Sequence, residues 1–205
     1  MTIRSRLSSE SGMTLIELAF VTAVLGIVLT SFLGTFDVVQ RQFGTQLDRS
    51  AGNDQARLAV EEIDREVRSG NLLYDPSLES TPGMMLRVYT QTNAPTRDPS
   101  NRCVQWKIQN KQLLVRNWSV AWETDGVVTG WRIVAEDIVN QSNNPQTPAF
   151  ALDGEASKGG RTLNVVILVN ANPVSGRDVR IQTSVTGRNT EYGYPTNICD
   201  DIPQG

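Results

Sequence analysis

Apolar positions dominate the chain from residue 13 to residue 36. Glu17 is the only ionisable side chain among these 24 residues. A helix of this length rises about 36 Å, which is enough to cross a hydrocarbon layer about 30 Å thick. Arg4 and Arg6 precede the segment and Asp37 follows it. By the positive-inside rule, this order predicts a single-pass membrane helix with its amino end in the cytoplasm and the rest of the chain outside it.

The apolar positions become periodic over residues 37–70. They recur at helical spacing among charged and amide side chains, at Val39, Phe43, Leu47, Ala51, Leu58, Ala59, Ile63 and Val67. This spacing is typical of an amphipathic helix that buries one face. Ser69-Gly70-Asn71 is a typical helix end. We therefore expect one continuous helix from Met13 to near Ser69.

After residue 71 the apolar positions alternate with a period of two, which is the pattern of β-strands. We expect a loop over 72–82 and strands over 84–90, 102–108, 112–122, 126–134, 150–152, 162–169 and 178–186. The strand at 162–169 is the most apolar and should be central and covered on both faces, with strand 178–186 beside it. The predicted fold class is α+β, in which the outer half of a long amino-terminal helix packs on an antiparallel sheet of about four to six strands.

Composition and charge exclude several classes of function. The 205 residues include 19 basic and 22 acidic side chains and no histidine. Without histidine, neither a hydrolytic triad nor a histidine-based zinc site can form. No basic stripe suited to nucleic acid is present. We therefore expect no enzymatic activity, no metal, no cofactor and no nucleic-acid partner.

The two cysteines, Cys103 and Cys199, lie far apart in the sequence. Their spacing does not match a paired metal-binding motif, but it is compatible with one disulfide in an oxidising compartment. In the chain-entropy model such a bond would stabilise the fold by roughly 4 to 5 kcal/mol. Two unpaired thiols remain the alternative, because pairing cannot be deduced from sequence alone.

The start of the apolar segment carries a specific motif. Gly12 is followed by Met13-Thr14-Leu15-Ile16-Glu17 after a short basic leader. This arrangement resembles the class III leader of type IV pilins and type II secretion pseudopilins. The resemblance implies cleavage after Gly12 by a prepilin peptidase and methylation of the new amino terminus on Met13. Family members most often carry Phe at that position, so Met13 is a departure, although it is also large and apolar.

The resemblance also implies an organisation and a role for Glu17. Residues 1–12 would be the leader peptide, 13–36 the membrane-spanning and filament-core helix, 37–70 its amphipathic extension, and 71–205 the extracytoplasmic β-rich domain. Glu17 of one subunit would neutralise the free amino terminus of a neighbour in the apolar filament core. Gly26 and Gly34 lie in a stretch that can lose its helical hydrogen bonds in related filaments; small-residue packing between membrane helices is the alternative.

A looser resemblance extends over the rest of the chain. Residues 57–69, 106–116 and 185–189 are similar to J-type minor pseudopilins and PilW-like minor pilins. This resemblance implies a minor pilin that primes or joins a filament, first in the inner membrane and then in a pilus or pseudopilus. Its partners would be other major and minor pilins or pseudopilins, the prepilin peptidase and the inner-membrane assembly platform. The alternatives are a filament-tip adhesin, a DNA-uptake receptor, or a plain membrane-anchored extracytoplasmic domain.

Three further patterns have a functional and an ordinary interpretation. The sequence has four tryptophans, Trp106, Trp118, Trp122 and Trp131. They could form a sugar-binding platform or pack in the core, and their strand periodicity favours core packing. A calcium site or a solvated acidic tail would account for Glu191, Asp200 and Asp201. The solvated tail is the favoured interpretation, because the sequence contains no loop of regularly spaced oxygen ligands. Asn117-Trp118-Ser119 matches a glycosylation triplet inside a predicted strand, where an accidental match is the better explanation.

Overall fold

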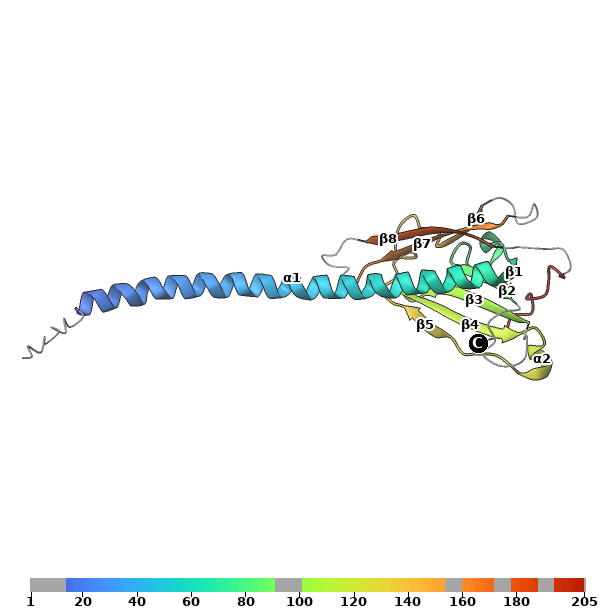
Figure 1. Ribbon diagram of the computed structural model, residues 1–205, viewed down its shortest axis with the longest axis horizontal. Helices are drawn as coiled ribbons and strands as arrows, with labels where there is room; N and C mark the ends of the chain where they lie inside the picture. The colour runs from blue at the N-terminus through green and yellow to red at the C-terminus, as the bar shows by residue number, and fades with distance from the viewer. Residues whose placement is uncertain (1–13, 91–100, 154–159, 172–177, 188–193, 205) are drawn as a thin grey trace, which may run out of the picture. The chain divides into compact units, whose positions relative to one another are not determined.

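The computed structural model describes residues 14–90, 101–153, 160–171, 178–187 and 194–204. Helix α1 (Leu15–Ser69) spans 55 residues and contributes to two compact units, Met1–Gln46 and Leu47–Gly205 (Figure 1). The end of α1 at Ser69 confirms the predicted helix end. In the first unit, the described residues beyond Thr14 are all part of this helix.

The second unit carries two antiparallel sheets. The five-stranded sheet has the order β1-β2-β3-β4-β5 and the three-stranded sheet the order β6-β7-β8. Their strands are β1 (Gly70–Leu73), β2 (Met85–Thr90), β3 (Arg102–Gln109), β4 (Gln112–Ser119), β5 (Arg132–Ala135), β6 (Phe150–Asp153), β7 (Thr162–Val169) and β8 (Val179–Thr186). The α+β class is confirmed, but the expectation of a single sheet is wrong, because a period-two pattern marks strands without marking which strands pair.

The chain passes from α1 directly into β1, where we expected only a helix end and a loop. Strand β1 pairs antiparallel with β2, with Gly70 opposite Thr90. A Cβ atom on Gly70 would lie 2.5 Å from Val88 Cγ1 and 3.1 Å from the Glu66 carbonyl oxygen. Only glycine therefore fits this close approach of helix end and strand. Strand β1 is followed by the short helix η1 (Pro76–Leu78).

The hairpin of β3 and β4 is confirmed. Its two-residue turn places Asn110 and Lys111 at φ values of 52° and 60°, the geometry of the type I′ turns that suit the twist of a hairpin. The fourth strand ends at Ser119, however, and Trp122 begins the short helix α2 (Trp122–Asp125). The strand expected over 126–134 is reduced to β5 and an isolated bridge between Trp118 and Val128.

Strand β7 is the central strand of its sheet and is buried on both faces, as predicted. Leu163, Val165 and Ile167 contribute to the main core, whereas Val166 and Leu168 form a separate cluster with Val139. Strand β8 pairs with β7 along its whole length, which confirms the expected neighbour.

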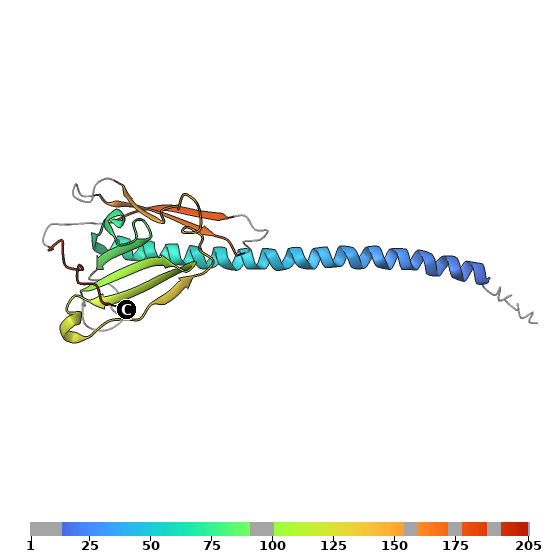
Figure 2. The same cartoon turned by 180° about the vertical axis from the view of Figure 1, so that it is seen from behind.

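The carboxyl-terminal part of α1 packs against both sheets (Figures 1 and 2). Its buried apolar residues are Gly52, Ala56, Ala59, Ile63 and Val67, and three of these five are Gly or Ala. A Cβ on Gly52 would lie 3.1 Å from Val169 Cγ1, so small residues let the helix lie close to the strands. Five of the eight apolar positions predicted for this helix face are exposed, namely Val39, Phe43, Leu47, Ala51 and Leu58. The predicted buried face is therefore wrong at these positions, most clearly at Leu47 and Leu58, which are 68% and 64% exposed.

Candidate functional site

The predicted cleavage position, Gly12, and the predicted new terminus, Met13, lie outside the described residues. The first described residue is Thr14, which precedes α1. Glu17 lies in the first turn of the helix, and its side chain is exposed. The surroundings of Glu17 are therefore the part of the predicted processing and assembly site that the structure describes.

Thr14 and Glu17 form a local cap at the start of α1. The Glu17 backbone N–H donates to Thr14 Oγ1 at 3.4 Å, and the Thr14 hydroxyl donates to Glu17 Oε2 at 3.5 Å. A Thr at the N-cap with Glu three residues later is the capping-box pattern, and a carboxylate there also complements the helix dipole. A capping role for these two residues was not predicted from the sequence, although the spacing Thr14-x-x-Glu17 is the sequence pattern of a capping box.

Helix α1 contains one segment, Leu15–Gly44, that is long and apolar enough to span a membrane. None of its most apolar stretch is buried in the structure. Its hydroxyl groups donate hydrogen bonds to backbone carbonyls of the same helix: Thr30 donates to the Gly26 carbonyl at 2.7 Å and Ser31 donates to the Ile27 carbonyl at 2.9 Å. The segment therefore offers other molecules a nearly continuous apolar surface.

Gly26 and Gly34 lie within the unbroken helix, and a Cβ atom on either would meet no atom within 4 Å. Neither glycine is thus required by packing inside this chain. Whether the helix opens between them in a filament stays a prediction.

Cys103 and Cys199 form a disulfide, with Cα atoms 5.8 Å apart. Three hydrogen bonds hold the same part of the tail to the sheet. Arg87 Nη1 donates to the Cys199 carbonyl at 2.7 Å, the Cys199 N–H donates to the Tyr74 hydroxyl at 2.9 Å, and Trp122 Nε1 donates to the Asp201 carbonyl at 2.9 Å. The tail is therefore fixed to the face of the five-stranded sheet on which Cys103 lies, opposite the face that carries Val104 and Trp106 in the main core.

The acidic tail residues have separate surroundings. Asp200 Oδ1 lies 3.4 Å from Arg87 Nη1, Asp201 is exposed, and Glu191 lies outside the described residues. No group of three potential metal-ligating side chains occurs among the residues that the structure describes.

The tryptophans divide into two pairs. Trp106 and Trp118 are 0% and 1% exposed, which confirms core packing for these two. Trp122 and Trp131 are partly exposed. Asn117, the first residue of the possible glycosylation triplet, is half-buried in β4, and its backbone N–H and carbonyl both bond the Thr129 hydroxyl.

A buried ion pair joins α1 to the five-stranded sheet, and sequence reasoning did not find it. Arg102 Nη2 donates to both carboxylate oxygens of Glu66, at 3.0 and 3.3 Å. Burial nevertheless raises the pKa of Glu66, because the loss of hydration outweighs the attraction of Arg102. The sequence feature that could have indicated this ion pair is the position of Glu66 next to Val67, on the side of the helix that is buried.

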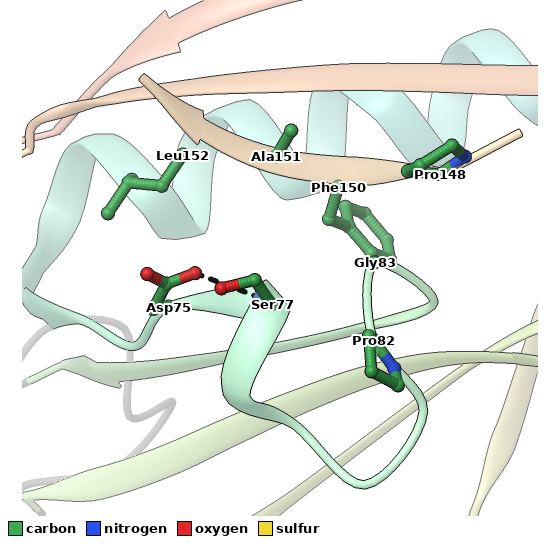
Figure 3. Close-up of a pocket in the computed structure, with 8 residues that line it drawn as sticks. All are labelled: Asp75, Ser77, Pro82, Gly83, Pro148, Phe150, Ala151 and Leu152. Atoms are coloured by element: carbon green, nitrogen blue, oxygen red, sulfur yellow. Dashed lines mark hydrogen bonds between the residues drawn. The ribbon is translucent and has the colours of Figure 1, made fainter. Parts of the chain in front are cut away.

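A groove of about 590 Å³ lies between the η1 segment and β6 (Figure 3). Pro82, Pro148 and Leu152 supply apolar walls, and Asp75 and Ser77 are its polar residues. One Asp75 oxygen accepts a hydrogen bond from the Ser77 backbone N–H at 2.9 Å. This carboxylate therefore caps η1, and the groove brings together no recognisable set of catalytic groups among the described residues.

Neither models of known protein families nor curated proteins match this sequence. The structure itself has an amino-terminal apolar helix, antiparallel sheets and a disulfide. A functional conclusion therefore rests on these features and on the residues at the start of α1.

Proposed function

We propose that this chain is a minor pilin or pseudopilin, a structural subunit that primes or joins a type IV pilus-like filament and catalyses no reaction. One observation carries the proposal: in the sequence the Gly12-Met13 junction stands just before an apolar helix that has Glu17 in its first turn and whose side chains are exposed over Leu15–Gly44. A β-rich domain that contains a disulfide is consistent with a location outside the cytoplasm, because disulfides persist in oxidising compartments.

In this proposal α1 occupies two environments in succession. Leu15–Gly44 first crosses the inner membrane, with the second unit on the extracytoplasmic side. The prepilin peptidase then removes residues 1–12, and the assembly platform transfers the subunit into a filament with other major and minor pilins or pseudopilins. In both environments the apolar side chains are kept from water. Removing them from water is the main favourable contribution to the free energy of membrane insertion and of filament assembly.

Glu17 has a second role in the filament. Cleavage creates a positively charged amino group on Met13, and an isolated charge is costly in an apolar core. Glu17 of one subunit neutralises the amino terminus of its neighbour, and a paired, hydrogen-bonded charge is tolerated there. The long bonds to Thr14 leave the carboxylate able to accept a stronger donor.

The processing step is tested by mass spectrometry of the full chain. The chain is produced in one bacterial strain with a prepilin peptidase and in one without it, then extracted from membranes. We expect a chain that begins at Met13, with or without a methyl group, only in the strain with the enzyme. Gly12→Val should block the cleavage, whereas Ser9→Val in the same leader should not. A chain that keeps Met1 in the competent strain refutes the proposal and leaves a plain membrane-anchored domain.

The role of Glu17 is tested by separating charge from capping. Glu17→Gln keeps a hydrogen-bonding side chain at the helix start but removes the charge, whereas Thr14→Val removes only the cap. We expect both variants to insert and to be cleaved, and only Glu17→Gln to be lost from the sheared filament fraction. Equal incorporation of Glu17→Gln and the unmodified chain would rule out the electrostatic role.

A further inference from the structure

Strand β8 forms one edge of the three-stranded sheet, because β7 is its only neighbour in that sheet (Figure 1). It pairs with β7 over eight consecutive residue pairs without a shift in register. Its sequence, Val-Arg-Ile-Gln-Thr-Ser-Val-Thr, contains neither proline nor glycine. The side of β8 that faces away from β7 is therefore a long and regular strand edge that no other described strand covers.

Two hydrogen bonds identify the backbone groups of β8 that face this open edge. The N–H of Gly187, just after β8, donates to the Arg161 carbonyl at 2.8 Å, and the N–H of Val166 in β7 donates to the Ala149 carbonyl on the β6 side at 2.8 Å. Along an antiparallel pair, successive residues point their backbone groups alternately toward and away from the partner strand. The outward N–H and C=O groups therefore belong to Arg180, Gln182, Ser184 and Thr186. Within the described part of the chain, no backbone group outside the sheet forms a hydrogen bond with them.

The other three edge strands of the two sheets are short and irregular or partly covered. Strand β1 has four residues, all buried, and a register shift against β2. Strand β5 also has four residues and a register shift against β4. Strand β6 has four residues, and its Phe150 N–H donates to the Gly83 carbonyl at 2.9 Å. Short strands, irregular pairing and covering segments protect sheet edges from further pairing, and β8 shows none of them among the described residues.

The side chains of β8 indicate what a neighbouring strand should carry. On the face toward the core, Val185 is buried, whereas Val179, Ile181 and Thr183 are only half-buried. Ile181 packs against the main core, so β-branched side chains added beside it would remove more of this apolar surface from water. On the opposite face, Arg180 is exposed and is the only charged residue of β8.

We propose that the open edge of β8 binds an extended segment of another protein, which adds to the three-stranded sheet as an antiparallel fourth strand. The backbone of this segment exchanges hydrogen bonds with the outward groups of β8. Its β-branched side chains lie on the core side, and a carboxylate lies opposite Arg180. In such strand addition, main-chain hydrogen bonds supply affinity and alternate side chains supply specificity. The inference is independent of filament assembly, because it concerns the second unit alone.

A segment of a different protein suits this edge better than a second copy of the chain. Strand β8 contains Arg180 and no acidic residue, so two β8 strands paired along their length place no carboxylate opposite Arg180. Opposite charges across a strand pair stabilise it, and a partner with Glu or Asp at that position gains this contribution. Nucleic acids and polysaccharides do not match the edge, because only a polypeptide carries one N–H donor and one C=O acceptor at each residue.

The test uses the full chain, labelled with nitrogen-15, in detergent micelles. The probe is the acetylated peptide Thr-Val-Ser-Val-Thr-Val-Glu amide, which in antiparallel register places its Glu opposite Arg180 and its first Thr opposite Thr186. It carries N-methyl groups on its second and third Val, whose N–H groups would point away from β8. The control peptide carries them on Ser and on the second Thr, whose N–H groups would face β8. A third peptide is the probe with Gln in place of Glu.

Two substitutions at Gln182 form a matched pair. Gln182→Pro removes one outward N–H but no bond to β7, and proline is tolerated at an edge position of this kind. Gln182→Thr changes the same side chain and keeps the N–H. Slow amide exchange at Ile181 and Thr183, whose N–H groups bond β7, checks that β8 still pairs with β7 in both variants. If Gln182→Pro loses that slow exchange, the comparison of the two N-methylated peptides decides the outcome.

In the free chain we expect fast amide exchange at the outward residues of β8 and slow exchange at Ile181 and Thr183. The probe should slow the exchange of the outward amides. The control peptide, and the probe with Gln182→Pro, should bind about tenfold more weakly, because main-chain hydrogen bonds are lost. The Gln peptide should bind about threefold more weakly, as expected for one exposed ion pair, and Arg180→Gln should abolish this difference.

Several results would overturn the proposal. Slow exchange of the outward amides in the free chain would show that a segment of the same chain or a second copy already covers the edge, and dilution would tell these two apart. Equal binding of the probe and the control peptide, equal binding by Gln182→Pro and Gln182→Thr, or unchanged exchange with the probe would each show that β8 does not accept an added strand.

Discussion

Reduction of the disulfide between Cys103 and Cys199 is the perturbation whose cost follows most directly from the structure. The chain has only two cysteines, so a reducing agent breaks this bond and no other. The bond closes a loop with a sequence separation of 96 residues, which contains every strand from β4 to β8. Its loss would therefore free most of the second unit in the unfolded chain.

The magnitude follows from the loop length. In the chain-entropy model a loop of this size lowers the entropy of the unfolded chain by an amount worth about 4.7 kcal/mol at 25 °C. The hydrogen bonds that join the tail to Tyr74, Arg87 and Trp122 do not use the sulfur atoms, so the native state should keep them. We expect the free energy of unfolding to fall by about 4 to 5 kcal/mol, which corresponds to a shift of about 2 M in the urea midpoint.

The assay is urea unfolding of the full chain in detergent micelles, followed by far-ultraviolet circular dichroism with and without a reducing agent. Circular dichroism is preferable to fluorescence, because Trp118 lies opposite Cys103 in the sheet and its emission would respond to the sulfur atoms directly. The double variant Cys103→Ala with Cys199→Ala should not respond to the reducing agent. A difference below about 1 kcal/mol between the oxidised and reduced chains would refute the chain-entropy argument for this loop.

Four other substitutions, of which Gly130→Ala is a control, test the second unit by chemical unfolding. Gly70→Ala places a Cβ 2.5 Å from Val88 Cγ1 and should cost about 1 to 3 kcal/mol; Gly130→Ala, which meets no atom within 4 Å, should cost less than 1 kcal/mol. Asn140→Ala leaves a buried backbone N–H, a buried carbonyl and a partly buried carbonyl without its amide and should cost about 3 kcal/mol. Burial raises the pKa of Glu66 above its ordinary value of 4.5. Its folded form therefore holds the proton more tightly, and the free energy of unfolding should fall as pH rises from 4.5 through the raised pKa; Glu66→Gln should remove that slope.

The parts of the fold that sequence predicts are those set by local chemistry. The end of α1 at Ser69 follows from a glycine that the chain needs there, and the β3–β4 turn follows from two residues with positive φ. Strand β7 was recognisable because both of its faces are apolar. Each of these features is determined within a few neighbouring residues.

The features that sequence reasoning missed depend on residues that are distant in the chain. The division into two sheets depends on which strands pair along their edges, and the alternation of apolar and polar residues along each strand does not determine this pairing. The buried side of α1 is marked by Ala56 and Ala59 and not by Leu47 and Leu58, because close packing against the sheets selects small residues over large ones. Trp131 reaches Lys107 and Arg116 from a different segment, so these contacts are visible only once the register is known.

The two glutamates near the ends of α1 show how position decides what a carboxylate needs. Glu66 is 6% exposed and finds its countercharge within the chain, in Arg102. Glu17 lies in the most apolar part of the sequence, and no basic side chain among the described residues forms an ion pair with it. Thr14 supplies hydrogen bonds but no charge. Once the helix leaves water, a charged Glu17 therefore requires a cation, and in the proposed filament the amino group that cleavage before Met13 would create on a neighbouring subunit would meet that requirement.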